Sequence, residues 1–249
     1  MQVESLLHMQ AGSLLHMGVG SLLHMGVGSL LHMQVRRGRS NLQIAGLTKL
    51  SLVDWPGKVC AVVFTRGCNF RCPWCFNLSL VIPELYAPLI PQDAVVDYLY
   101  ARRGFLDGVV ITGGEPTLQN DLLDFIRLLK SWGYQVKIDT NGSQPAALQK
   151  ILECKPPAVD CLAIDLKAPL DLDKYNRAAG LPVNIKDLKQ SLRLAACSAR
   201  PVYLRTTIIP EFHSQEDIKE IKNIYRNLKK INSHLVQVFQ EYQPPLLKR

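Results

Sequence analysis

Short apolar runs rich in β-branched residues alternate with amphipathic stretches along most of the chain. From residue 59 onward, each apolar run is followed by a segment whose apolar side chains recur at the spacing of a helix. This alternation predicts strand–helix units built around a parallel sheet. The predicted strands cover residues 59–65, 108–112, 135–139, 161–165, 201–207 and 234–240.

The helical pattern is clearest in two segments, residues 118–132 and 215–230. In the second segment, Ile218, Ile221 and Tyr225 fall on one face of a helix. Six strands joined by right-handed crossovers can form either a doubly wound sheet or an incomplete barrel. The pattern therefore predicts an α/β fold and leaves these two architectures open.

The placement of polar motifs separates the two architectures. In parallel α/β folds the chemistry collects where the strands end, and nearly every unusual polar motif of this chain directly follows a predicted strand. The motifs are a cysteine-rich loop after the first strand, Gly113-Gly114-Glu115-Pro116 after the second, Asp139-Thr140-Asn141-Gly142 after the third, Asp165-Leu166-Lys167 after the fourth and Thr206-Thr207-Ile208-Ile209-Pro210 after the fifth. Because several strands feed one rim, we expect a partial (βα)6 TIM-like barrel.

The N-terminal segment is unlike the rest of the chain. Residues 5–32 hold four near-copies of a unit that begins Ser-Leu-Leu-His-Met, and their period of eight residues fits no common packing repeat. We expect residues 1–35 to be a disordered extension produced by tandem duplication, with Met33 as a candidate alternative start, and residues 36–249 to be one domain. The regularly spaced histidines could instead bind a metal. These are His8, His16, His24 and His32.

Charge and cysteine usage narrow the functional classes. The net charge of +8 is spread along the chain, which indicates a solvated basic surface rather than a nucleic-acid-binding one. The seven cysteines follow no secreted disulfide spacing, and no signal peptide is recognisable. The recurring His and Gly of the N-terminal repeat make it a poor membrane span. We therefore expect a cytoplasmic protein with no nucleic-acid or membrane partner.

Three cysteines stand close together after the first predicted strand. Cys68, Cys72 and Cys75 have the spacing CxxxCxxC, with no fourth cysteine beside them. Structural zinc sites close with four protein ligands, whereas three thiolates leave one position of a metal or cluster open for substrate chemistry. Cys60 lies at the start of the preceding strand, roughly 15–25 Å away if that segment is extended. The spacing therefore predicts a reactive metal or cluster site.

Each strand-end motif also has an ordinary structural interpretation. Residues 113–115 can form a simple strand-to-helix turn, or they can let the backbone approach a small polar ligand. Residues 139–142 fit a turn with a helix-capping residue. Asp165 and Lys167 can be a solvated ion pair or, if both point into the rim, a carboxylate for hydroxyls and a cation for a carboxylate. The order of these motifs after the cysteine loop favours the functional interpretation.

The cysteine loop, with Trp74 before its third cysteine, and the glycine-rich strand end together resemble the radical S-adenosylmethionine (SAM) superfamily. The match extends to the activating proteins of anaerobic ribonucleoside-triphosphate reductase and covers roughly residues 47–239. The resemblance implies a barrel of the radical SAM type and a catalytic domain at residues 36–249. The segments that carry it are residues 51–58, 68–75, 111–117, 137–142 and 163–167.

This resemblance implies a cofactor role for eleven residues, while no other side chain is assigned to catalysis. Three cysteines would bind three irons of one 4Fe-4S cluster, and SAM would chelate the fourth. The implied cluster ligands are Cys68, Cys72 and Cys75. The implied SAM contacts are Gly113, Gly114, Glu115 and Asp139 at the methionyl amino group, Thr140 and Lys167 at the carboxylate, Asp165 at the ribose hydroxyls and Trp74 near the adenine.

The implied reaction is reductive cleavage of SAM to methionine and a 5′-deoxyadenosyl radical. That radical would abstract a hydrogen from a backbone glycine of a partner enzyme. The implied partner is a glycyl radical enzyme, in the first place anaerobic ribonucleotide reductase, and the implied electron donor is flavodoxin or ferredoxin. No further cysteine occurs between Cys75 and Gly113, so the extra cluster-binding insert of some activases is not expected.

Several positions lie outside the assigned site. Phe76 follows the third cysteine where many activating proteins carry His, and it is assigned no chemistry because it lacks a ring nitrogen. His213 could reach the ribose or be an ordinary surface histidine, and it is also left unassigned. The remaining downstream cysteines are expected to be small core residues. They are Cys154, Cys161 and Cys197.

Two other functions fit part of the pattern. A radical SAM enzyme acting on a small heterocycle, similar to 7-carboxy-7-deazaguanine synthase, shares the cysteine loop and the glycine-rich strand. Residues 51–58 and 139–142 favour the activating proteins over that enzyme. A non-catalytic protein that binds zinc through the three cysteines is the other alternative, but it leaves the ordered rim motifs unexplained.

Overall fold

The computed structural model describes residues 42–229 and 235–241, so the expectations for residues 1–35 lie outside the described residues. In chain order the elements are β1 (Ile44–Ser51), β2 (Cys60–Thr65), α2 (Leu78–Val81), η2 (Pro83–Leu85), α3 (Gln92–Ala101), β3 (Gly108–Gly113), η3 (Pro116–Leu118), α4 (Leu122–Ser131), β4 (Gln135–Thr140), α5 (Pro145–Leu152), β5 (Cys161–Asp165), α6 (Leu172–Ala179), α7 (Ile185–Cys197), β6 (Val202–Ile208), α8 (Gln215–Lys229) and β7 (Leu235–Glu241).

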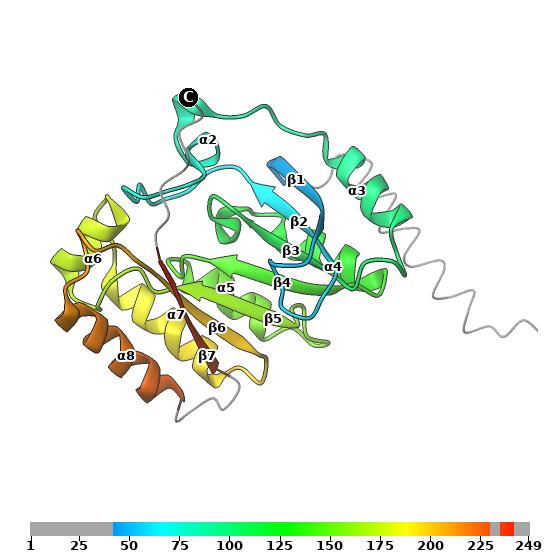
Figure 1. The fold of residues 1–249 in the computed structure, drawn as a ribbon. Helices are drawn as coiled ribbons and strands as arrows, with labels where there is room; N and C mark the ends of the chain where they lie inside the picture. The colour runs from blue at the N-terminus through cyan, green and yellow to red at the C-terminus, as the bar shows by residue number, and fades with distance from the viewer. Residues whose placement is uncertain (1–41, 230–234, 242–249) are drawn as a thin grey trace, which may run out of the picture.

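Among the described residues, one sheet contains seven strands in chain order. Strands β2 to β7 run parallel to their neighbours, whereas β1 lies antiparallel to β2. Within the described residues no pairing joins β7 back to β1, so the sheet is an open barrel. Figure 1 shows the twisted sheet with helices gathered along its outer side. The predicted partial (βα)6 barrel is confirmed.

The boundaries of the predicted strands all lie within one residue of the observed ones. One strand was not predicted, and one helix begins later than predicted. Strand β1 was not predicted, because Gly46 and Lys49 interrupt its apolar pattern and it depends on pairing with β2. The helix predicted from residue 118 begins only at Leu122, since Gln119 is extended after the 3-10 turn η3. The helix predicted over residues 215–230 corresponds to α8.

The outer face of the sheet carries the main hydrophobic core. Successive strand residues point to opposite faces, so alternate positions such as Val63, Ile111 and Ile138 face the helices. Phe125 and Leu129 of α4 are fully buried in the same core. The burial of apolar side chains therefore fixes which face of each strand is left to line the interior of the barrel.

The inner face changes character along the strands. Near the strand starts, Trp55 from the β1–β2 loop covers a small apolar cluster that includes Cys60, Val110 and Cys161. Further along the same face the side chains become polar and charged, beginning at Lys137. The interior is thus closed by apolar packing at one end and is polar at the carboxyl ends. None of the helices in the described ranges is both long and apolar enough to cross a bilayer.

A candidate cofactor site at the carboxyl ends of the strands

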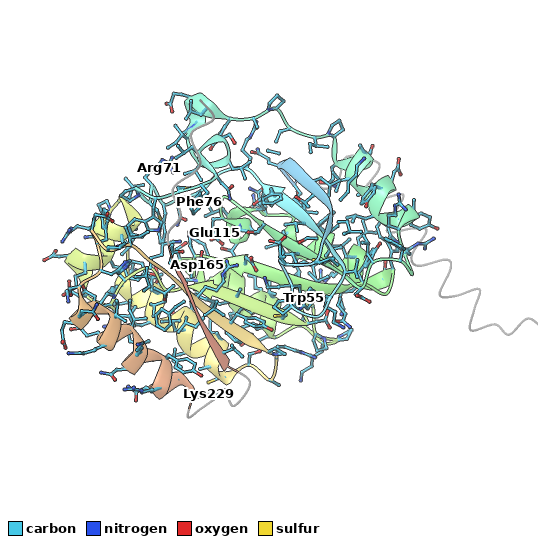
Figure 2. The ribbon with its side chains drawn as sticks, in the orientation of Figure 1. Trp55, Arg71, Phe76, Glu115, Asp165 and Lys229 are labelled. Carbon is cyan, nitrogen blue, oxygen red and sulfur yellow. The ribbon has the colours of Figure 1, made fainter. Side chains whose placement is uncertain are left out.

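A cavity of about 400 Å³ opens at the carboxyl ends of β2 to β6. Figure 2 shows Phe76, Glu115 and Asp165 around this region and Trp55 toward the opposite end of the sheet. The structure brings all eleven predicted site residues to the wall of this one cavity. They are Cys68, Cys72, Trp74, Cys75, Gly113, Gly114, Glu115, Asp139, Thr140, Asp165 and Lys167.

The loop that carries the three cysteines is tied to neighbouring elements by its backbone. Gly67 N donates to Leu80 O at 2.7 Å, and Arg71 N donates to Ala179 O at 2.6 Å at the end of α6. The Arg71 guanidinium also donates to the carbonyl oxygens of Cys68 and Phe70, each at 2.8 Å. The loop conformation is therefore set by protein contacts on both of its sides.

Two glycines allow this close packing. A Cβ on Gly114 would lie 2.0 Å from the carbonyl oxygen of Gly67, and Glu115 N donates to that same oxygen at 2.8 Å. Gly180, the C-cap of α6, has a φ of +69°, and a Cβ there would lie 1.9 Å from the carbonyl oxygen of Arg71. Both glycines bring backbone against the cysteine loop, so Gly114 has a packing role whether or not it contacts a ligand.

The thiols of the loop would bind a metal cluster only as thiolates. Burial raises the pKa of Cys68 to about 11 and also raises the pKa of Cys72, which lies near the Lys167 cation. A metal centre must therefore displace protons from these thiols and supply the positive charge that stabilises the thiolates. In the described part of the chain, no three His, Cys, Asp or Glu side chains are arranged to hold a single ion. An iron–sulfur cluster does not need such convergence, because each thiolate binds a different iron.

Glu115 is fully buried and links the ends of β3 and β4. Its carboxylate accepts hydrogen bonds from Thr117 N, Thr117 Oγ1, Thr140 Oγ1 and Asn141 N at 2.5–3.1 Å. Burial raises the pKa of Glu115, and these four hydrogen bonds oppose the rise. The proton of the Thr140 hydroxyl is thus already committed to Glu115, and its oxygen accepts from Gly142 N at 3.1 Å.

A network of five charged side chains crosses the inner face from β4 to β6. Arg205 donates to Asp139 Oδ2 at 2.7 Å and to Asp165 Oδ1 at 2.9 Å. Lys137 Nζ lies 2.6 Å from the other Asp139 oxygen, and Lys167 Nζ lies 3.3 Å from Asp165 Oδ2. Three cations thus face two carboxylates, which leaves the network one positive charge for an anionic ligand.

Arg205 is a charged site residue that was not predicted from the sequence. It occupies the middle of β6, where Tyr203 packs against the inner apolar cluster and Thr207 lines the cavity. A single arginine within a mostly apolar strand was the available signal, because an arginine on an inner face requires charged partners. The two partners come from β4 and β5, and the sequence does not show that they are adjacent.

The network sets the ionisation of Asp165. Burial disfavours the charged carboxylate, but Arg205 and Lys167 outweigh this effect and lower its pKa to about 2. Burial likewise lowers the pKa of Lys167, and the Asp165 charge reverses this and raises it above the ordinary value. At neutral pH the cavity therefore presents an ionised carboxylate beside a protonated amine.

Trp74 is buried at the cavity wall against Phe212 and His213. The interpretation of His213 as a surface histidine is wrong, because the side chain is buried and both ring nitrogens bond to the protein backbone. Ile209 N donates to His213 Nδ1 at 3.0 Å, and Nε2 lies 2.8 Å from Lys167 O. Since Nδ1 accepts, Nε2 carries the proton and donates to Lys167 O. His213 thus positions the backbone at Lys167.

The other cysteines have mixed environments. Cys161 is buried as predicted, and burial raises its pKa to about 12. Cys197 is exposed at the end of α7, so the prediction of a core residue is wrong there, and Cys154 is only partly buried. The end of an amphipathic helix leaves Cys197 on the solvent side, which a count of apolar residues does not reveal.

Comparison with protein families identifies the chain. The family model described as the radical SAM superfamily matches residues 62–230, which span the sheet from β2 to the end of α8. The chain belongs to the radical SAM superfamily. Members of this superfamily use an iron–sulfur cluster to cleave SAM and generate a radical, and this chain is an enzyme of that class.

The curated relatives of this radical SAM protein include activating enzymes. A Methanocaldococcus jannaschii protein that carries the provisional name glycyl-radical enzyme activating enzyme is 32% identical over 203 residues, which cover 79% of this chain and 80% of the relative. The pyruvate formate-lyase-activating enzyme of Clostridium pasteurianum is 29% identical over 200 residues, 76% of this chain and 78% of its own. The chain is therefore a member of the glycyl-radical-enzyme activating family, which excludes the non-catalytic scaffold.

Solved structures share the fold. Streptococcus suis SuiB matches with a TM-score of 0.53 at 17% identity, over 73% of this chain and 39% of SuiB. TYW1 with a lysine–pyruvate adduct bound matches with a TM-score of 0.52 at 22% identity, over 76% of this chain and 66% of TYW1. These matches support the partial barrel described above.

Proposed function

We propose that this chain cleaves SAM at one 4Fe-4S cluster and uses the resulting radical to form a glycyl radical on a partner enzyme. The observation that carries the proposal is the convergence of the three cysteine thiols and the charged strand ends on one cavity. Membership of the superfamily supports the cleavage of SAM, and the named relatives support a glycyl radical enzyme as partner.

The cysteine loop would hold the cluster. Cys68, Cys72 and Cys75 would supply three thiolates, and the loop offers no fourth, so one iron would remain open to the amino and carboxylate groups of SAM. When both are bound, the reduced cluster would supply the one electron that splits SAM into methionine and a 5′-deoxyadenosyl radical. The chain itself binds both groups, orients them and keeps water away from them.

The strand ends would orient SAM. Lys167 provides a cation for the methionyl carboxylate, and ionised Asp165 accepts hydrogen bonds from the ribose hydroxyls. Arg205 holds the carboxylates of Asp139 and Asp165 in fixed orientations. Thr140 would contribute to the carboxylate site mainly by holding Glu115, because its hydroxyl proton is already donated to that carboxylate.

The remaining predicted contacts complete the pocket. The backbone of Gly113 and Gly114 would face the methionyl amino group, with Asp139 nearby. Glu115 would hold that turn, since its oxygens already accept four hydrogen bonds. Trp74, packed against Phe212, would lie near the adenine.

The first test follows the cluster and SAM directly. The chain is purified without oxygen, reconstituted with iron and sulfide and reduced with dithionite, and its electron paramagnetic resonance (EPR) spectrum is recorded with and without SAM. We expect a 4Fe-4S signal that changes with SAM, together with 5′-deoxyadenosine. Cys154→Ala is the matched control, because Cys154 lies outside the cavity wall, and it should retain both signals. A wild-type chain that binds zinc but no iron would refute the proposal.

The second test concerns the partner. Residues 51–58 carry part of the resemblance to activators of anaerobic ribonucleoside-triphosphate reductase, and Asp54 of this segment lines the cavity. We therefore propose that reductase as the partner and flavodoxin or ferredoxin as the electron donor. The chain is incubated with SAM, reduced flavodoxin and either the reductase or pyruvate formate-lyase, and the glycyl radical is measured by EPR. A radical on pyruvate formate-lyase only would refute the choice of partner, and 5′-deoxyadenosine without a radical on either enzyme would refute the activase function.

A further inference from the structure

The side chain of Asn141 connects the loop after β4 to the cysteine loop. Its Oδ1 accepts from Ser143 N at 2.9 Å, and its Nδ2 donates to Asn69 Oδ1 at 3.0 Å. Asn69 Nδ2 in turn donates to Ser143 Oγ at 2.8 Å, which closes a ring of hydrogen bonds between the two loops. The Nδ2 atom of Asn141 also lies 3.9 Å from Cys68 Sγ in hydrogen-bonding geometry.

The ring fixes which way the Asn141 amide points. The backbone N–H of Ser143 can only donate, so the atom facing it must be the oxygen of Asn141. The NH2 group therefore faces the cysteine loop, where its two hydrogens have two acceptors, Asn69 Oδ1 and Cys68 Sγ. The hydrogen bond to the sulfur thus follows from the network rather than from a free choice of amide orientation.

Burial strengthens the hydrogen bond from Asn141 to the Cys68 sulfur. Asn141 is only 5% exposed, and its backbone N–H donates to buried Glu115 at 2.6 Å. The amide is therefore held in place, and a hydrogen bond to a charged acceptor is stronger in such buried surroundings.

We propose that Asn141 is a positioning residue that donates a hydrogen bond to the Cys68 thiolate and thereby raises the reduction potential of the bound cluster. The inference rests on the proposed function, because it requires a cluster at Cys68. Hydrogen bonds to the sulfur ligands are one of the factors that set cluster potentials. Reduction adds negative charge to the cluster and its thiolates, so a donor at the sulfur stabilises the reduced form more than the oxidised form.

The test is a redox titration of the reconstituted full-length chain without SAM, followed by EPR. In Asn141→Ala, the ratio of reduced to oxidised cluster at a fixed solution potential should fall about threefold to tenfold, and a tenfold fall corresponds to about 59 mV for a one-electron couple. Ser143→Ala is the matched control. It removes the hydroxyl that accepts from Asn69 but keeps the backbone N–H that orients Asn141, so its ratio should stay within about twofold of the wild-type value.

The outcomes separate this inference from the proposed function. A wild-type ratio in Asn141→Ala overturns the inference, and so does an equal fall in Ser143→Ala, because ordering of the ring would then explain the effect. If Asn141→Ala binds no iron, the same titration is made on Asn141→Ser. Serine lacks the side-chain amide but keeps the backbone bond to Glu115. A wild-type chain without a cluster overturns both proposals, whereas a SAM-responsive cluster with an unchanged potential in the Asn141 variants overturns this one only.

Discussion

Replacing Arg205 with glutamine removes one cation from two carboxylates at once. Arg205 lies 2.7 Å from Asp139 and 2.9 Å from Asp165, and the three side chains are 25%, 7% and 32% exposed. Glutamine retains much of the aliphatic stem but none of the charge. The two carboxylates keep one lysine each, Lys137 and Lys167, so neither is left without a counter-charge.

The magnitude follows from the ionisation of Asp165. Its pKa falls from 3.8 to about 2 in the folded chain, which corresponds to about 2 kcal/mol of stability shared between Arg205 and Lys167. Asp165 accounts for only part of the effect, because Arg205 also pairs with Asp139, which is 7% exposed. Losing one partner of a buried pair typically costs about 3–5 kcal/mol, and the lysines that remain place the total at the lower end. We expect Arg205→Gln to lower the free energy of unfolding by about 3 kcal/mol at pH 7, or about 6–12 °C in melting temperature.

The pH dependence has a defined sign. Because the folded-state pKa of Asp165 is depressed, its contribution is fully present above about pH 4 and is lost as the pH falls to about 2. The stability difference between the wild type and Arg205→Gln should therefore shrink from pH 5 towards pH 2.

Urea unfolding of the metal-free chain, followed by circular dichroism between pH 7 and pH 2, measures both effects. Arg127→Gln is the matched control, since Arg127 pairs with Asp124 on the surface, where both side chains are more than half exposed. That change should cost less than about 1 kcal/mol. Equal unfolding free energies for Arg205→Gln and Arg127→Gln at pH 7 would refute the argument that Arg205 organises the network.

Three further changes test the site. Cys72→Ala should abolish cluster assembly and SAM cleavage, and turnover retained in an assay for 5′-deoxyadenosine would contradict the assigned ligand. Gly114→Ala places a Cβ 2.0 Å from Gly67 O, so we expect a loss of at least about 2 kcal/mol in urea unfolding and less iron bound per chain; wild-type values for both would contradict the packing role. Lys167→Met should weaken SAM binding to the reconstituted chain at least about tenfold by calorimetry. Lys130→Met, which breaks a pair with Asp160 away from the cavity, should not, and equal affinities would show that Lys167 does not bind SAM.

The sequence predicted β2 to β5 well because these strands are buried on nearly all positions of both faces. Runs such as residues 108–112 are continuously apolar at their starts, and turn residues follow directly, so the strand ends are marked. Strand β1 has partly exposed positions and pairs antiparallel at the edge, so its pattern is weaker. Its existence depends on β2, which a local pattern does not show.

The site likewise contains residues that the sequence predicts and residues that it does not. The cysteine spacing and the strand-end motifs are local, and the fold brings them together because parallel strands end on the same rim. Arg205 and His213 were missed or misread because their roles depend on partners distant in sequence, namely Asp139, Asp165 and the backbone at Lys167. His213 was misread because it is buried, and the residues next to it in the sequence do not indicate this burial.

The contacts that hold the cysteine loop determine whether the chain stays folded when oxygen destroys its cluster. In small zinc domains the metal creates the fold, and removing it unfolds the chain. Here the backbone bonds from Gly67 to Leu80 and from Arg71 to Ala179 order the loop through the protein itself. Fixing the backbone of this loop costs entropy worth about 1–2 kcal/mol per residue. The contacts made on folding offset this cost, so iron binding does not have to. We expect a chain stripped of its cluster by air to keep its shape, so that the damage is reversible and fresh iron and sulfide can repair the enzyme without a new round of synthesis.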